Sequence, residues 1–154
     1  MSPTRPRKVA VLMGSPNDAA KLAPALEMLE RFGLTADERV MSAHRTPDQV
    51  AEFARSARDE GYAAVICGAG MAAHLAGVVA AHSTLPVVGV PLSGGALNGV
   101  DALYATVQMP RGIPVATVAI DGAANAAILV VEMLAITDKT LADRLAKFRA
   151  EGAR

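Results

Sequence analysis

The stretch Ala63-Ala-Val-Ile-Cys67 leads directly into Gly68-Ala-Gly-Met-Ala-Ala-His74, and together they predict how this chain folds. A short apolar run with β-branched residues is typical of a strand that is buried on both faces, as in a parallel sheet. The small residues after it predict a turn, and a short helix is expected to follow. A buried strand that leads through a turn into a helix is the repeating unit of α/β folds.

Further strands and helices are predicted on both sides of this stretch. The segment 35–41 is more polar than the other strands, which favours an edge position. Leu141, Leu145 and Phe148 share one face of the last helix. These elements predict a doubly wound α/β fold, a three-layer sandwich in which a five-stranded parallel sheet has helices on both faces. Besides 63–67, the predicted strands are 8–13, 35–41, 86–90 and 115–120, and the predicted helices are 19–31, 47–60, 98–107, 122–136 and one from about 137.

Length and composition fit one domain. We expect residues 8–154 to form a single α/β domain with a C-terminal helix, and residues 1–7 to be a disordered lead rather than a signal peptide. Only 3% of the residues are aromatic, and 15 basic residues balance 15 acidic ones, which argues against binding to nucleic acid or to a membrane surface. A single cysteine excludes an internal disulfide framework and fits the reducing cytoplasm.

Charged residues are scarce in the second half of the chain. Between Tyr62 and Val131 the only ones are Asp101, Arg111 and Asp121. Prolines, histidines and glycines interrupt this stretch before it reaches the roughly 20 apolar residues that a membrane-spanning helix needs. Because a soluble monomer is expected to carry more charge on its outward helix faces, we predict that much of this half is buried against other copies of the chain.

Several familiar site motifs are absent or incomplete. Neither glycine-bearing turn completes G-x-G-x-x-G, so dinucleotide binding is disfavoured, and the absence of a P-loop excludes ATP binding through that motif. The sequence also lacks the G-x-S-x-G motif of α/β-hydrolases. Three separated histidines and one cysteine make no zinc signature, so no metal site is predicted. Cys67 follows an apolar strand and is interpreted as a packing residue.

The stretch Ser42-Ala-His-Arg-Thr-Pro-Asp48 combines an imidazole, a fixed cation and a helix start. Thr46 suits the N-cap, the proline after it suits the first helical position, and Gln49 completes a capping box. His44 and Arg45 are therefore expected just before a helix N-terminus, where the helix dipole favours an anion. The plainer interpretation is a capped helix preceded by two solvated polar residues.

Ligands of doubly wound sheets bind at the carboxyl ends of the strands, where the strand order switches. This rule gathers the loops 14–18, 42–46, 68–74 and 108–114. Hydroxyls, a carboxylate, a guanidinium and backbone N–H groups suit a phosphorylated sugar, because arginine binds phosphate and a carboxylate can accept bonds from two neighbouring hydroxyls. The side chains that these loops supply are Ser15, Asp18, Ser42, His44, Arg45, His74 and Arg111.

The three histidines carry different expectations. His44 is the candidate general acid and base, because an imidazole titrates near neutral pH, and its alternative role is that of a phosphate donor. His74 lies among small apolar residues on a predicted helix, and structural and catalytic roles both stay open. His82 is interpreted as a surface or interface residue.

Six motifs together resemble one enzyme family. They are similar to those of the N5-carboxyaminoimidazole ribonucleotide mutases, the catalytic subunits of phosphoribosylaminoimidazole carboxylase in bacterial-type purine synthesis. The resemblance extends from about Val9 to Phe148. The motifs are Met13-Gly-Ser-x-x-Asp18, Ser42-Ala-His-Arg-Thr-Pro47, Gly68-Ala-Gly-x-Ala-Ala-His-Leu75, Gly89-Val-Pro91, Gln108-Met-Pro110 and Gly112-Ile-Pro-Val115.

The resemblance implies a flavodoxin-like fold and a homo-octamer whose sites are built from neighbouring subunits. It also implies a mutase that moves CO2 from N5 to C4 of the aminoimidazole ribonucleotide without metal, biotin or ATP. His44 is the catalytic residue on this basis. A transient contact with the synthetase that makes the substrate stays open. The implied substrate-binding residues are Ser15, Asp18, Ser42, Ala43, Arg45, Gly70, Met71, His74 and Leu75.

The chain departs from the family pattern at a few positions. Asn17 stands where serine is common, Met71 replaces a usual glycine, Ala76 replaces a usual proline, and the connection after Ile120 is shorter than usual. None of these changes touches His44 or Arg45, so we expect activity. Two alternatives are a related carboxylase that uses free CO2 and a non-catalytic phosphoribosyl-binding module. The Gly-Ala-Gly-x-Ala-Ala-His motif favours the mutase over that carboxylase.

Overall fold

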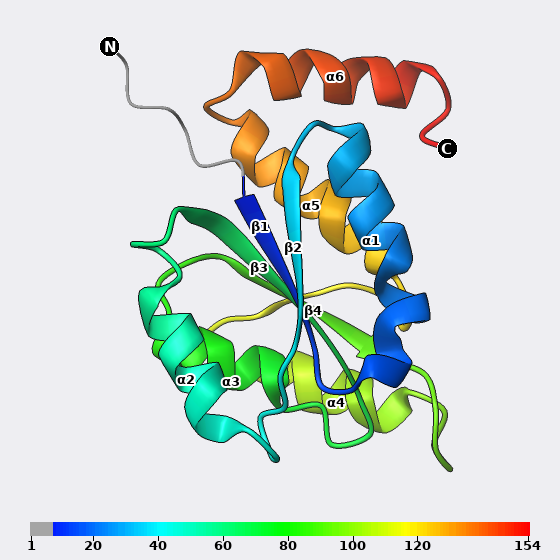
Figure 1. Ribbon diagram of the computed structural model, residues 1–154. Coiled ribbons are helices and arrows are strands. Elements are labelled where there is room, and N and C mark those ends of the chain that lie inside the picture. Colours follow the sequence, from blue (N-terminus) through cyan, green and yellow to red (C-terminus); the bar gives the residue numbers. More distant parts are fainter. Residues whose placement is uncertain (1–7) are drawn as a thin grey trace.

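The computed structural model describes residues 8–154 and shows a parallel sheet with helices on both faces (Figure 1). Its five strands lie in the order β2-β1-β3-β4-β5, so the predicted doubly wound, flavodoxin-like fold is confirmed. The prediction for residues 1–7 lies outside the described part. The strands are β1 (Lys8–Met13), β2 (Thr35–Val40), β3 (Tyr62–Gly70), β4 (Val87–Leu92) and β5 (Ala116–Thr117).

The helices form the two outer layers of the sandwich (Figure 1). Helices α1 and α5 cover one face of the sheet and α6 packs on α5, whereas α2, α3 and α4 lie on the other face. No helix within residues 8–154 has the length and apolar character needed to cross a bilayer. The helices are the short 3-10 helix η1 (Pro16–Asp18), α1 (Ala19–Arg31), α2 (Pro47–Ser56), α3 (Leu75–His82), α4 (Val100–Val107), α5 (Ala123–Ala135) and α6 (Lys139–Ala150).

Alternate residues of the central strands enter two separate cores. In β1, Val9, Val11 and Met13 pack under α1 and α5, while Ala10 and Leu12 pack under α2 and α3. All five side chains are fully buried. A strand that is buried on both faces needs no polar alternation, which is why these strands appear in the sequence as continuous apolar runs.

Two predicted strand boundaries are wrong for identifiable reasons. Residues 68–70 were expected to form a turn, but they extend β3 because they pair with the end of β4. β5 is limited to Ala116–Thr117 instead of 115–120. The carbonyl groups of Gly89 and Pro91 both accept hydrogen bonds from the β5 side. Since Pro91 has no N–H to donate in that direction, the ladder cannot continue past it.

Two predicted helices are shorter than expected. Helix α2 ends at Ser56 rather than near residue 60, and turns connect it to β3. Helix α4 begins at Val100 rather than at Asn98, because Asn98 and Gly99 have φ angles of +47° and +93°. These left-handed angles are incompatible with the first turn of a right-handed helix.

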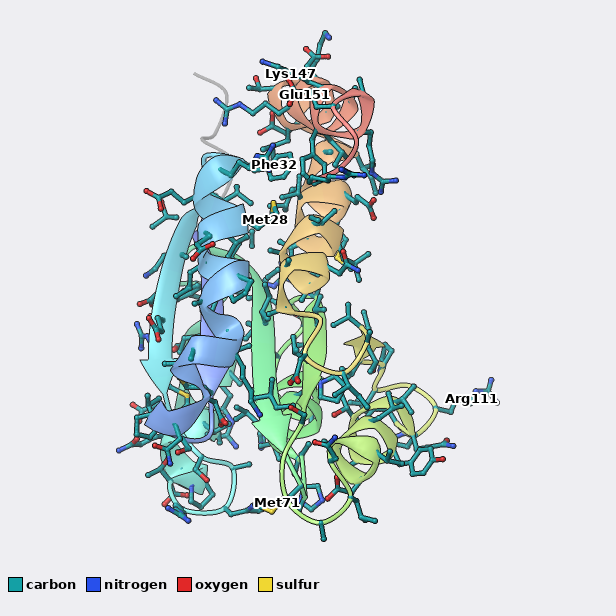
Figure 2. The ribbon with its side chains drawn as sticks, turned by 90° about the vertical axis from the view of Figure 1, so that its right-hand side faces the viewer. Met28, Phe32, Met71, Arg111, Lys147 and Glu151 are labelled. Atoms are coloured by element: carbon teal, nitrogen blue, oxygen red, sulfur yellow. The ribbon has the colours of Figure 1, made fainter. Side chains whose placement is uncertain are left out.

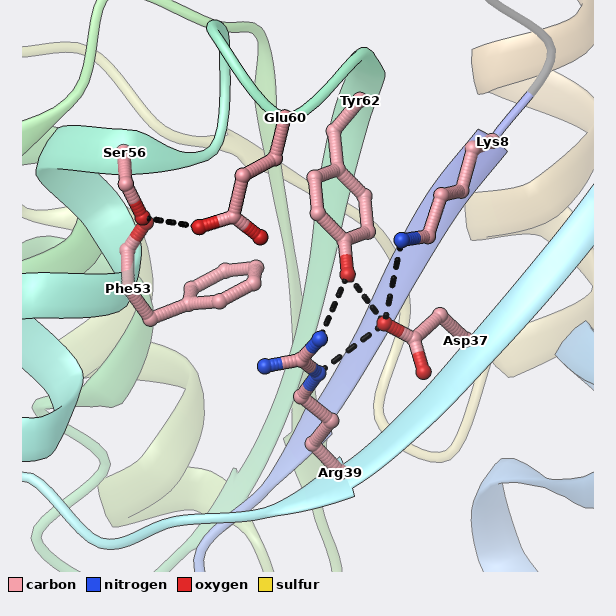
Figure 3. Close-up of polar contacts among 7 residues, drawn as sticks. All are labelled: Lys8, Asp37, Arg39, Phe53, Ser56, Glu60 and Tyr62. Atoms are coloured by element: carbon pink, nitrogen blue, oxygen red, sulfur yellow. Dashed lines mark hydrogen bonds and ion pairs between the residues drawn. The ribbon is translucent and has the colours of Figure 1, made fainter.

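A polar cluster joins side chains of the edge strand β2 to side chains of β1 and β3 (Figure 3). The hydroxyl of Tyr62 on β3 donates to Oδ2 of Asp37, and Nε of Arg39 donates to the same oxygen at 2.9 Å. Nζ of Lys8 on β1 lies 3.8 Å from that oxygen. Partial burial opposes ionisation of Asp37, but the bonds from Tyr62 and Arg39 and the charges of Arg39 and Lys8 outweigh it and lower the pKa of the carboxyl group. Asp37 therefore stabilises the sheet edge in its ionised form.

Candidate active site

The loops after β1, β2, β3 and β4 meet at the carboxyl edge of the sheet and line a cavity of about 410 Å³. Strands β2 and β3 lie on opposite sides of β1, so the switch point in strand order lies between β1 and β3 at these strand ends. Three of the four predicted loops, 14–18, 42–46 and 68–74, come together there. The residues that the family resemblance implies for the site all line the cavity: Ser15, Asp18, Ser42, Ala43, His44, Arg45, Gly70, Met71, His74 and Leu75.

The fourth predicted loop, 108–114, does not contribute to this cavity. Arg111 lies well away from Met71, which marks the cavity end of the molecule (Figure 2). The loop precedes β5 and lies beside residues 83–87, at the amino ends of β4 and β5 and not at their carboxyl ends. Its expected place is taken by Ser93-Gly94-Gly95, which directly follows β4. A serine and two glycines immediately after an apolar strand are the sequence signal that would have found this loop.

Ser42 and Thr46 shape the loop that presents His44 and Arg45. The hydroxyl oxygen of Ser42 accepts hydrogen bonds from the N–H groups of His44 (3.3 Å) and Arg45 (3.1 Å). Thr46 takes the N-cap position of α2, but its hydroxyl accepts from the Ser42 N–H and donates to the Ser42 carbonyl instead of capping the helix. The predicted capping box is therefore wrong, and the same groups close the loop instead. Both His44 and Arg45 have exposed side chains at the cavity.

His44 and His74 are in direct contact across the cavity. Nε2 of His44 lies 2.7 Å from Nδ1 of His74, a hydrogen-bond distance, and the two rings meet edge to face at 84°. Only one hydrogen fits between the two nitrogens, so one ring donates and the other accepts. His74 is exposed and is not a core histidine, which removes the structural role in packing that the sequence left open. The contact joins the loop after β2 to the start of α3.

The loop after β1 supplies a hydroxyl and a carboxylate. Ser15 caps the short helix η1 by accepting from the N–H of Asn17 at 3.2 Å. Asp18 stands at the N-cap of α1, but its carboxylate makes no capping bond and lines the cavity instead. Partial burial raises the pKa of Asp18, although the Lys21 cation and the Ser15 backbone oppose the shift.

The turn after β3 shows why glycine is usual in the family at the position of Met71. Met71 has a φ angle of +50°, a left-handed conformation that glycine adopts without steric cost and other residues adopt rarely. Its side chain is 60% exposed and lies at the cavity. A Cβ atom on Gly95 would lie 3.2 Å from the Cγ and Sδ atoms of Met71, so this side chain packs on the loop after β4. The turns after β3 and β4 thus support each other.

The remaining candidates for reactivity lie outside the cavity. Cys67 is 2% exposed, and burial raises the pKa of its thiol far above the usual range, so the predicted packing role is consistent with the structure. His82 lies at the other end of α3, with Nδ1 3.5 Å from Nη2 of Arg55. Within residues 8–154, no cluster of three or more histidine, cysteine or acidic side chains could hold a metal ion.

Comparison with known proteins decides the family. The sequence pattern of the AIR carboxylase family matches residues 8–154. The chain belongs to the AIR carboxylase family. The match starts at the first residue of β1 and therefore includes every loop that lines the cavity.

Individual AIR carboxylase relatives agree with this assignment. The N5-carboxyaminoimidazole ribonucleotide mutase of Saccharolobus solfataricus is 52% identical over 141 residues, which cover 92% of this chain and 89% of that protein. The mutase of Escherichia coli (strain K12) is 51% identical over 150 residues, covering 96% and 89%. The crystal structure of PurE from Treponema denticola has a TM-score of 0.86 at 27% identity and covers 95% of this chain and 91% of that one. The resemblance drawn from the motifs is confirmed.

Proposed function

We propose that this protein converts N5-carboxyaminoimidazole ribonucleotide to 4-carboxy-5-aminoimidazole ribonucleotide, a step of purine synthesis in which CO2 moves from N5 to C4. The observation that carries this proposal is the contact between His44 and His74 within the shared cavity. It is supported by relatives about half identical in sequence that are named as mutases for this substrate. The reaction needs a group that can both give and take a proton, and His44 is suited to that task.

The nucleotide is proposed to lie along the carboxyl edge of the sheet. Arg45 and the N-terminus of α2 bind the phosphate, because a guanidinium and a helix N-terminus both favour an anion. The carboxylate of Asp18 accepts hydrogen bonds from the ribose hydroxyls. The hydroxyls of Ser15 and Ser42 each accept backbone bonds and still carry a proton to donate to the ligand.

His44 moves the proton in both halves of the reaction. As the N5–C bond of the carbamate breaks, imidazolium protonates N5 and CO2 is released into the cavity. C4 then attacks CO2 to form the new C–C bond, and the neutral imidazole removes the C4 proton. The histidine thus regains its starting state, and no net proton is consumed. His74 orients the His44 ring through the 2.7 Å contact.

Proton transfer of this kind typically contributes about 10²- to 10⁴-fold in rate. A larger part of the acceleration must come from keeping released CO2 beside C4, which replaces a bimolecular encounter with an intramolecular one. The wall of the cavity near His74 is built from small residues, Ala69, Gly70 and Ala72. Such a wall lets the backbone approach the aminoimidazole ring of the substrate closely.

Supplying each substrate separately tests this assignment. We expect the purified protein to convert N5-carboxyaminoimidazole ribonucleotide rapidly, and to turn over aminoimidazole ribonucleotide at low bicarbonate only slowly. Rapid turnover of the second substrate and none of the first would instead establish the carboxylase that uses free CO2. Binding of both ribonucleotides with turnover of neither would establish a non-catalytic binding module.

The proposal includes a homo-octamer in the cytoplasm, with any docking of the synthetase transient. Its support is an apolar stripe along α4, in which the exposed Val100, Tyr104 and Val107 recur at helical spacing. Leu97, which precedes the helix, is exposed as well. An exposed stripe of this kind is typical of a surface that is buried in an assembly. Sedimentation at low protein concentration tests it, and a monomer with full activity would refute sites built from neighbouring subunits.

A further inference from the structure

A polar cluster beside the cavity joins three segments that are far apart in the sequence. Lys21 on α1 donates from Nζ to the carbonyl oxygen of Ser93 and, at 3.1 Å, to its hydroxyl oxygen. The N–H and the hydroxyl of Ser93 both donate to the carboxylate of Asp121, at 2.9 and 2.5 Å. Ser93 is thus held by a cation on one side and by an anion on the other. Neither Lys21 nor Asp121 has a part in the reaction as proposed above.

Asp121 reaches Ser93 through an uncommon backbone conformation. Its φ angle is +58°, and its N–H donates to the carbonyl oxygen of Pro91 at 2.8 Å. The residue lies in the short connection before α5, one of the places where the sequence departs from the family pattern. Partial burial opposes ionisation of Asp121, but the bonds from Ser93 and the charge of Lys21 outweigh it and lower the pKa of the carboxyl group.

Ser93 is the first residue of the loop that forms one wall of the cavity. The next two residues, Gly94 and Gly95, have φ angles of +142° and +65° and no side chain, so the loop has little stiffness of its own. Gly95 in turn packs against Met71. In the sheet, β4 lies three strand spacings, about 14 Å, from β2. The wall therefore stands at the end of the cavity opposite Arg45.

We propose that Lys21 and Asp121 are positioning residues that hold the Ser93–Gly95 loop as the wall that keeps released CO2 beside the substrate. The proposal rests on the function proposed above. In the proposed binding mode the phosphate lies at Arg45 and the reacting ring extends toward the loop after β4, which lines the same cavity. Because the loop lacks stiffness, its position depends on the bonds to Ser93.

The chemistry gives this role a specific signature. After the N5–C bond breaks and N5 is protonated, CO2 has two fates. It either forms the C–C bond at C4, or it escapes and leaves aminoimidazole ribonucleotide as a free by-product. A displaced wall favours escape without weakening the phosphate contacts at the far end. The ratio of C4-carboxylated product to aminoimidazole ribonucleotide formed per turnover measures this partition directly.

The test compares Lys21→Met, Lys21→Arg and Asp121→Asn with the wild-type protein. Each is supplied with N5-carboxyaminoimidazole ribonucleotide, and the uncatalysed breakdown of the substrate is subtracted. We expect Lys21→Met and Asp121→Asn to lower the product ratio by about ten-fold, the factor that corresponds to loss of one charge-assisted hydrogen bond. Lys21→Arg should restore most of the ratio because a guanidinium can donate to the same two oxygens of Ser93. Glu27→Gln, an exposed change on the same helix, should leave the ratio unchanged.

Affinity and stability separate a positioning role from a purely structural one. Binding of aminoimidazole ribonucleotide in CO2-free buffer should be the same in all variants, because the phosphate end is untouched. An unchanged ratio in both Lys21→Met and Asp121→Asn, or a failure of Lys21→Arg to restore it, overturns the proposal. A loss of affinity and melting temperature with no change in the ratio also overturns it. Absence of turnover in the wild-type protein refutes the proposed function and this inference together, whereas equal ratios in an active protein refute only the inference.

Discussion

Replacing His74 by phenylalanine tests the ring contact at the centre of the cavity. Phenylalanine keeps a planar ring of similar size, so the edge-to-face packing on His44 is retained. The change removes Nδ1, the atom that lies 2.7 Å from Nε2 of His44. The variant therefore isolates the hydrogen bond from the packing.

The expected loss follows from the chemistry of that bond. His44 becomes an imidazolium again as it removes the C4 proton, and a hydrogen bond to a charged group contributes about 1.5–3 kcal/mol when it is shielded from water. Because both rings are exposed, we take about 1–1.5 kcal/mol, which corresponds to a fall in kcat of about five- to twelve-fold. Removal of His44 itself should cost more, about 10²- to 10⁴-fold.

Steady-state kinetics on the single and double variants check this ordering. In a His44→Asn background, His74→Phe should have no further effect on kcat, since its partner is already gone. His82→Phe, at the other end of α3, is the matched control and should leave kcat unchanged. A loss in His74→Phe as large as that in His44→Asn would refute orientation as the role of His74, and so would no loss at all.

Three further predictions concern binding and stability. Replacement of Arg45 by alanine should weaken binding of the phosphorylated ligand by roughly ten- to a hundred-fold and binding of the bare nucleoside far less, as measured by calorimetry; equal losses would reject the phosphate contact. Gly89→Ala should lower the free energy of unfolding by about 1–3 kcal/mol in urea titrations, because the new Cβ would lie 2.3 Å from Cγ2 of buried Thr106. The hydroxyl of Thr106 donates to the carbonyl oxygen of Ala102 in α4, which holds this side chain in place. An unchanged midpoint of unfolding would contradict this prediction. The pKa of Asp37 is lowered in the folded protein, so the contribution of this carboxylate to stability should be full above its unfolded pKa and be lost as pH falls through the folded value. Asp37→Asn should flatten that acid dependence. An identical pH profile of stability in the variant would refute the role of the Asp37 cluster.

The fold could be predicted because its strands are buried on both faces. Segments such as 9–13 and 63–67 carry apolar residues at every position, which a half-exposed sheet would not allow. The errors arose where a bond between distant residues decides the boundary. Pro91 ends the pairing of β5 from a neighbouring strand, and the pairing of 68–70 with β4 turns a predicted loop into strand. Neither effect is visible within a local window of sequence.

The site was predicted in part because the fold itself brings the strand ends together. Loops that follow strands of a parallel sheet share one edge, so the residues after β1, β2 and β3 meet. The loop 108–114 was misplaced because it precedes its strand. The contact between His44 and His74 spans 30 residues and depends on the orientation of two loops, which no spacing rule supplies. The role of Thr46 was misread because its hydroxyl has a nearer partner in Ser42 than in the helix.

The assay of His44→Asn with N5-carboxyaminoimidazole ribonucleotide tests the central claim most directly. The side chain is exposed at the cavity, so the change should leave the fold and the binding of the ribonucleotide intact. We expect formation of the C4-carboxylated product to fall by about 10²-fold or more while the dissociation constant of the ribonucleotide is maintained. Product formation at the wild-type rate in this variant would contradict the assignment of His44 as the group that moves the proton.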